Sequence, residues 1–192
     1  MRFSVTPAKH QELIGKGIYL VVNVDSETIN ALISWIVSNR PEKQEFTILI
    51  NSPGGTPALV LYFASFLATL APEVKIKGVT FGECGSAALA LLQCCHERVA
   101  VRDCGFFVHH INTEFVVNCQ KKDRKFLERV LAESRLLEEE LVRLQSKRTG
   151  MSRRAWMKLA DEGEEIRGRA ILSSRALTLG LVDKIIEEYP IF

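Results

Sequence analysis

The chain has 192 residues, of which 47% are hydrophobic and 25% are charged, and its net charge is +2. A chain of this length and composition is expected to fold as one domain around a substantial core. The nearly balanced charge, from 25 basic and 23 acidic residues, gives no reason to expect a nucleic-acid or membrane partner.

Strand-like and helix-like segments alternate through the first half of the chain. β-branched and aromatic runs predict strands at 17–24, 46–52, 74–81, 98–102 and 106–111. Helical patterns lie between them at 26–40, about 57–70 and about 85–95. The run at 57–72 is too short to span a bilayer. This alternation predicts an α/β fold of stacked βαβ units with a mostly parallel sheet.

The second half of the chain is predicted to be mainly helical. Residues 121–148 form an amphipathic pattern about 40 Å long if it is one helix. One domain of this size cannot easily bury such a rod, so part of its apolar stripe is expected to face another subunit. The alternative is an internal helix broken into two. A shorter helix follows, with Ser152 as its N-cap and Gly163 as its end, before a last short helix and a final strand.

The five cysteines favour a reduced, cytoplasmic setting. Their number is odd, two of them are adjacent and no CxxC pair occurs, so a disulfide framework or a zinc site is not expected. They are Cys84, Cys94, Cys95, Cys104 and Cys119. We expect the last four to be core or interface residues, and we expect neither a metal nor another cofactor.

The segment INSPGG, residues 50–55, follows a predicted strand directly. Two successive glycine N–H groups at the end of a strand can point at one oxygen atom, as in an oxyanion hole. A plain β-to-α turn is the alternative interpretation.

Cys84 lies between Gly82 and Gly85, where a strand is expected to pass into a helix. A helix N-terminus lowers the pKa of a thiol and makes it more nucleophilic, although a small buried cysteine is the commoner case. A base could come from His109 or His110, which would point to opposite faces of the strand 106–111.

Taken together, these segments resemble the ClpP family of self-compartmentalised serine peptidases. The resemblance covers nearly the whole chain and includes PEKQEFTILINSPGG, TGMS and SSRALTLGLVDKI. The intervals from Gly55 to Cys84 (84 − 55 = 29) and from Cys84 to His109 (109 − 84 = 25) match the family pattern. The resemblance implies a ClpP/crotonase-like fold in a single domain, 1–192. Its head would be about 1–111 and 150–192, and its handle helix about 112–149.

The resemblance also implies the roles of the site residues. Cys84 falls at the position of the serine nucleophile, His109 on the histidine, and Gly55 and Gly85 would supply the oxyanion hole. Ser86 is a weaker alternative nucleophile, because its use requires a gap in the alignment. The third catalytic residue is expected to be Glu165, with Asp161 and Glu164 as alternatives. The alternative interpretation of these three residues is a solvated acidic turn.

By resemblance, the chain would be a peptidase in a homo-oligomeric ring, a heptamer or a double ring, acting on polypeptides. The sequence contains no P-loop, so unfolding of a substrate would require a partner, and the resemblance suggests an AAA+ unfoldase. The glycine-rich strand that follows the histidine in the family is absent from residues 110–123. Two other functions stay open: a catalytically weak or inactive ring subunit, and a crotonase-like enzyme that acts on acyl-CoA.

Overall fold

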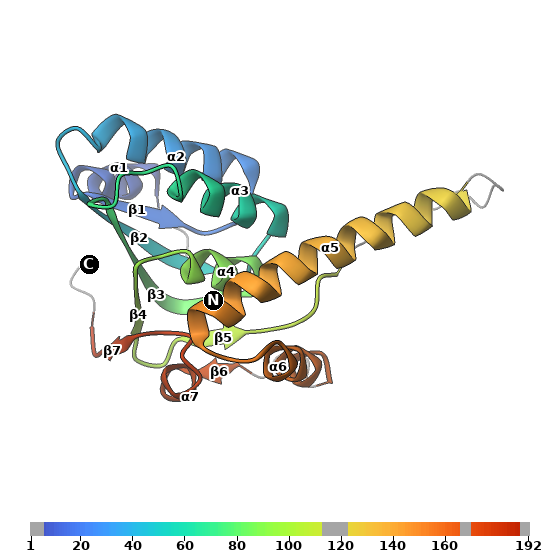
Figure 1. The fold of residues 1–192 in the computed structure, drawn as a ribbon. Helices are drawn as coiled ribbons and strands as arrows, with labels where there is room; N and C mark the ends of the chain where they lie inside the picture. The colour runs from blue at the N-terminus through green and yellow to red at the C-terminus, as the bar shows by residue number, and fades with distance from the viewer. Residues whose placement is uncertain (1–5, 113–122, 166–169, 189–192) are drawn as a thin grey trace.

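The computed structural model describes residues 6–112, 123–165 and 170–188, which form an α/β fold (Figure 1). The first part contains α1 (Pro7–Gly15), β1 (Ile18–Val21), α2 (Ser26–Asn39), β2 (Glu45–Ser52), α3 (Pro57–Leu67), β3 (Lys75–Gly85), α4 (Ser86–Gln93), β4 (Glu97–Val101) and β5 (Gly105–Phe107). The second part contains α5 (Asp123–Thr149), α6 (Arg153–Glu165), β6 (Ile171–Leu172), α7 (Ser173–Thr178) and β7 (Lys184–Ile186).

The described strands form one sheet in the order β1-β2-β3-β4-β7, with β5 attached to β3. The pairs along this path are parallel, and only β5 and β6 pair in the antiparallel sense. β3 lies at the centre of the sheet. Its first part pairs with β4 through 77–80, and its last part pairs with β5 through 83–85. The predicted mostly parallel sheet is therefore confirmed.

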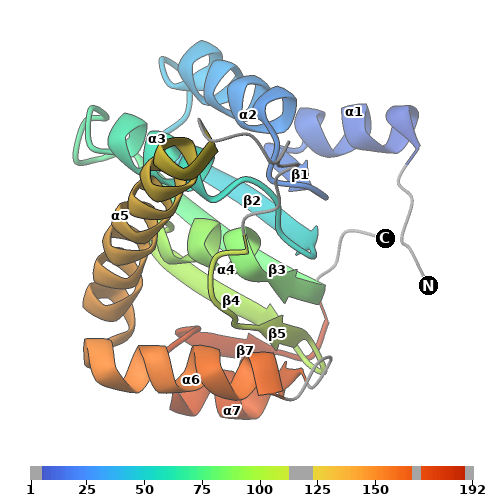
Figure 2. The same ribbon diagram turned by 90° about the vertical axis from the view of Figure 1, so that its right-hand side faces the viewer.

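Helices α2 to α6 cover one face of the sheet, and α1 packs against part of the other. The larger core lies between the sheet and helices α2 to α6, and includes the buried side chains of Ile36, Phe63 and Leu92. A smaller cluster on the other side packs Leu13 of α1 against Leu49 and other strand residues. Burial on both faces explains the nearly continuous apolar sequence of β2. Figure 2 shows α1 and α2 at one end of the molecule and α6 and α7 at the other.

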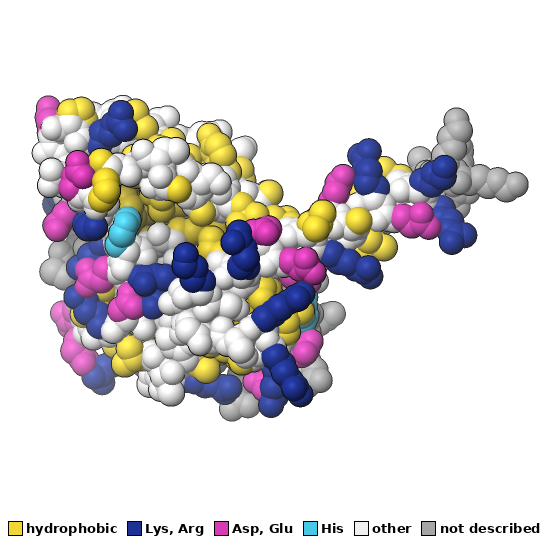
Figure 3. All heavy atoms as spheres, in the orientation of Figure 1, with side chains coloured by type: hydrophobic (Ala, Val, Ile, Leu, Met, Phe, Trp, Pro, Cys, Tyr) yellow, Lys and Arg dark blue, Asp and Glu magenta, His cyan; other side chains and the backbone are white. Residues whose placement is uncertain are grey.

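The long helix α5 is continuous from Asp123 to Thr149 and projects well beyond the rest of the fold (Figure 1). The prediction of a single long helix is correct, and the alternative of a broken one is wrong. Its inner end packs on the fold through the buried residues Leu141 and Val142. Hydrophobic side chains are visible on its projecting part in Figure 3. Within the described ranges, no helix combines the length and apolarity needed to cross a membrane.

Several predicted boundaries differ from the structure, and three of them bear on the site. β3 continues to Gly85 instead of ending at 81, because its last residues pair with β5. The strand predicted at 106–111 ends at Phe107. Helix α6 runs through Gly163 to Glu165, although its predicted N-cap is correct: the Ser152 hydroxyl accepts from Ala155 N at 3.2 Å.

Candidate active site

The glycine turn after β2 is fixed against Val24, three residues beyond the end of β1. Gly54 and Gly55 have φ values of 128° and 148°, which side-chain-bearing residues rarely adopt. The backbone of Val24 donates to the Gly54 carbonyl at 2.9 Å and accepts from Thr56 N at 2.7 Å. A Cβ added to Gly55 would lie 2.3 Å from the Val24 carbonyl oxygen. The turn therefore requires both glycines, and it places the backbone of Gly55 in the wall of a cavity.

A sharp strand-to-helix junction faces this turn. β3 ends at Gly85 and α4 begins at Ser86, whose φ of 50° is unusual for a residue with a side chain. A Cβ on Gly54 would lie 2.7 Å from the Ser86 Cβ, so the glycine makes room for the serine. Strained strand-to-helix turns of this kind present a nucleophilic serine in other hydrolases. The side chain of Ser86 lines the same cavity as Gly55.

Cys84 does not lie at a helix tip, and this prediction is wrong. The residue belongs to β3, where it is opposite Ser52 of β2 and Phe106 of β5, and it is 0% exposed. Burial raises the pKa of its thiol well above the ordinary value, which is the opposite of the activation expected from the sequence. Cys84 is not among the described residues that line the cavity.

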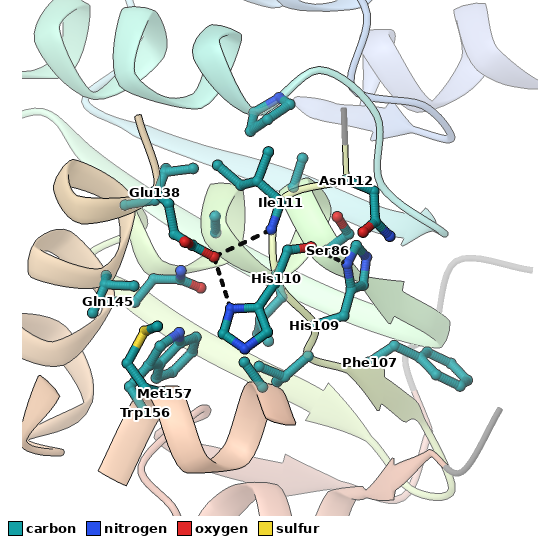
Figure 4. A pocket seen from close by; sticks show the side chains of 18 of the residues that line it. Ser86, Phe107, His109, His110, Ile111, Asn112, Glu138, Gln145, Trp156 and Met157 are labelled. Atoms are coloured by element: carbon teal, nitrogen blue, oxygen red, sulfur yellow. Dashed lines mark hydrogen bonds and ion pairs between the residues drawn. The ribbon is translucent and has the colours of Figure 1, made fainter. Parts of the chain in front are cut away.

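The cavity has a volume of about 160 Å³ and lies between α4, α5, α6 and the segment that follows β5 (Figure 4). Its apolar wall includes Leu89, Leu141 and Trp156. Its polar lining includes Ser86, His109, His110, Glu138 and Gln145. Reactive side chains thus meet an apolar surface, as in many sites that bind small ligands or peptide side chains.

His109 and His110 do not point to opposite faces as predicted, because β5 has already ended at Phe107. Both line the same cavity as Ser86 (Figure 4). Nδ1 of His109 is 2.5 Å from the carbonyl oxygen of His110. Since a carbonyl can only accept, Nδ1 bears the proton. In the neutral ring, Nε2 is then the nitrogen able to accept one.

Of the three acidic candidates, Asp161 is the one whose side chain is described, and it contacts His110 instead of His109. Asp161 Oδ1 lies 2.8 Å from Nε2 of His110, and Glu138 Oε1 lies 2.8 Å from Nδ1 of the same ring. Glu165 was expected in an extended segment, but its backbone belongs to α6. The side chains of Glu164 and Glu165 lie outside the described part of the structure.

The two predicted oxyanion donors lie in different places. Gly55 lines the cavity, whereas Gly85 is not among its lining residues: it pairs with Phe107, and a Cβ on it would lie 2.7 Å from the Pro53 carbonyl oxygen. Ala87, which follows Ser86, lines the cavity instead. It is in the first turn of α4, where backbone N–H groups have no partner within the helix.

Three other cysteines lie in the described part of the chain. Cys95 and Cys104 are buried and Cys94 is half-buried, and all three are free thiols. Within the described ranges, no group of His, Cys, Asp and Glu side chains is arranged to hold a metal ion. Residues 113–122 lie outside the described residues. They include Cys119 and most of the segment in which the family's glycine-rich strand is absent from the sequence.

Glu138 and Ala87 were not singled out from the sequence, and Ser86 was ranked below Cys84. The signal for Ser86 was the small-residue setting Gly-Ser-Ala-Ala at a strand-to-helix junction. Glu138 offered no such signal, because it is one of many acidic residues on α5.

Comparison with known proteins identifies a family. No curated protein matches the chain. The model of the Clp protease family matches residues 9–189, which include the glycine turn, the Ser86 junction and both cavity histidines. The chain therefore belongs to the Clp protease family.

Proposed function

We propose that this chain is a ClpP-like peptidase in which Ser86, rather than Cys84, is the nucleophile and His109 is the general base. The observation that supports it best is the lining of one cavity by Ser86, His109 and Gly55, from which Cys84 is excluded by burial. The proposal keeps the acyl-enzyme chemistry expected of the family and changes the atom that forms the acyl bond from sulfur to oxygen.

In this mechanism Nε2 of His109 accepts the proton of the Ser86 hydroxyl as Oγ attacks the carbonyl carbon of a peptide bond. The N–H groups of Gly55 and Ala87 stabilise the oxyanion of the tetrahedral intermediate. The intermediate collapses to an acyl-Ser86 ester, and His109 returns the proton to the leaving amine. Water then hydrolyses the ester by the same route, with His109 again as the base.

Membership of the family supports an assembly of several copies. Members of the Clp protease family generally form homo-oligomeric rings. We expect this chain to do the same, as a heptamer or a double ring, with an AAA+ unfoldase as a partner that delivers polypeptide substrates. The exposed apolar residues Phe126, Leu131 and Leu136 of α5 support contact with another copy.

The test compares Ser86→Ala with Cys84→Ala in hydrolysis of fluorogenic peptides and unfolded casein. We expect Ser86→Ala to reduce kcat by about 10³-fold or more, and Cys84→Ala to leave it nearly unchanged. A fluorophosphonate, which reacts with activated serines, should label Ser86 in the wild-type chain and in Cys84→Ala.

Two results would overturn the proposal. Hydrolysis that survives in Ser86→Ala would show that another residue is the nucleophile. Wild-type rings that neither hydrolyse peptides nor react with the fluorophosphonate would favour an inactive structural subunit.

A further inference from the structure

His110 is held between carboxylates from two different helices. Glu138 of α5 is 2.8 Å from its Nδ1, and Asp161 of α6 is 2.8 Å from its Nε2. An ionised carboxylate can only accept, so both ring nitrogens donate and the ring is an imidazolium in this arrangement. The bond to Glu138 is drawn in Figure 4.

Glu138 also holds the peptide unit that joins residues 110 and 111. Its Oε1 accepts from the backbone N–H of Ile111 at 3.3 Å (Figure 4). The carbonyl at the other end of this same peptide unit belongs to His110, and it accepts from Nδ1 of His109 at 2.5 Å. Because a peptide unit is planar and rigid, fixing its N–H also fixes the direction of its C=O.

We propose that Glu138 and His110 are positioning residues, which orient the 110–111 peptide so that its carbonyl holds His109 in the tautomer that acts as a base. The inference rests on the proposed function, since it concerns the base of that reaction. It also gives Asp161 a role different from the one predicted: Asp161 anchors the ring of His110 and acts on His109 only through it.

This arrangement predicts an effect of pH. Burial alone would lower the pKa of His110, but its bonds to Asp161 and Glu138 outweigh burial and raise the pKa above the ordinary value. Among the described residues that line the cavity, His109 is the ionisable one besides His110 and Glu138. Below the ordinary histidine pKa, the protonated ring of His110 donates both of its hydrogen bonds, to Glu138 and to Asp161. As pH rises through the raised pKa, the ring loses a proton and with it one of these two bonds. We therefore expect kcat to fall on the alkaline side.

The experiment measures kcat, KM and the pH dependence of kcat for Glu138→Gln and Asp161→Asn. Glu138→Gln should lower kcat about tenfold with little change in KM, because it weakens the hold on the peptide and not the cavity wall. Both variants should move the alkaline fall to lower pH, since each removes a charge that stabilises the imidazolium. Asp161→Asn should affect kcat less, because Asp161 has no described bond to the peptide unit.

Glu139→Gln is the matched control. Glu139 pairs with Arg153 at 3.3 Å, so it also joins α5 to α6, but it is not among the residues lining the cavity. We expect its kcat and pH profile to match the wild type. If Glu138→Gln keeps both the wild-type kcat and the wild-type pH profile, the inference is wrong.

A second measurement separates this inference from the proposed function. In ¹⁵N-histidine-labelled protein, NMR should show His109 protonated at Nδ1 in the wild type and a mixture of tautomers in Glu138→Gln. This readout does not require hydrolysis, so it holds even if Ser86→Ala were to leave activity intact. A single Nδ1–H tautomer retained in Glu138→Gln, with unchanged thermal stability, would overturn the positioning role.

Discussion

Cys84 and Ser86 are two positions apart, yet the fold gives their side chains opposite environments. Along β3, side chains alternate between the faces of the sheet, so Cys84 lies on the same face as Thr80 and Ile76, and all three are fully buried. The strand then ends, and the positive φ of Ser86 turns the chain into α4. The break in strand geometry is what takes Ser86 out of the alternation and into the cavity wall.

The burial of Cys84 predicts that its thiol reacts slowly with alkylating reagents. An alkylating reagent reacts with the thiolate, and burial both raises the pKa of this thiol and blocks approach of the reagent. We expect iodoacetamide to modify Cys84 much more slowly in the native protein than in the same chain in denaturant, as followed by peptide mass spectrometry. Equal rates in the two conditions would show that the sulfur is accessible.

One glycine, Gly163, allows helix α6 to pack closely against the segment that leads into His109. Gly163 packs so tightly on the segment before His109 that an added Cβ would lie 1.8 Å from the Val108 carbonyl oxygen. The same helix supplies Asp161 to the ring of His110. The contact of α6 with residues 108–110 therefore helps to set the position of both histidines.

Gly163→Ala is expected to push α6 away from this segment. The clash is with backbone, which cannot rotate away, so the free energy of unfolding should fall by about 1–3 kcal/mol. Because His109 moves with Val108, kcat should fall as well. Denaturant unfolding and peptide hydrolysis measure the two effects.

Gly15→Ala is the control for this prediction. Gly15 is also helical, but nothing lies within 4 Å of its added Cβ. We expect this variant to keep its activity and to gain up to about 1 kcal/mol in stability, from the lower entropy of its unfolded chain. A Gly163→Ala protein as stable and active as Gly15→Ala would contradict the packing argument.

The elements of the fold could be predicted from the sequence more fully than the site. Apolar runs predict β1 to β4 and helices α2 to α7 to within a few residues, because these patterns reflect burial along a single element, whereas α1 was not predicted. The length of β3 and the early end of β5 depend on their pairing with each other, which no single segment encodes. Cys84 was predicted to be the nucleophile because its intervals to Gly55 and His109 match the family pattern. Its position four residues after Thr80, on the same face of one strand, would have indicated a buried side chain.

Helix α5 joins the candidate active site to the surface that we expect to assemble. Its inner end contributes Glu138, Leu141 and Val142 to the cavity. Its outer part projects from the fold (Figure 1) and includes Leu131 and Leu136, which are 49% and 63% exposed. Large apolar side chains on a projecting helix are costly in water and favour contact with a second copy. Assembly should therefore also hold in place the helix that orients the 110–111 peptide.

The double variant Leu131→Lys/Leu136→Lys is expected to weaken this assembly. Two ammonium groups at an apolar contact would have to lose their hydration, so the oligomer seen by analytical ultracentrifugation should shift towards smaller species at equal concentration. Peptide hydrolysis should fall with it, because the inner end of α5 loses its support. Leu177→Lys on α7 changes a leucine of similar exposure, 42%, on another helix, and should retain both assembly and activity. If the double variant sediments and hydrolyses peptides like Leu177→Lys, the projecting part of α5 is not the contact between copies.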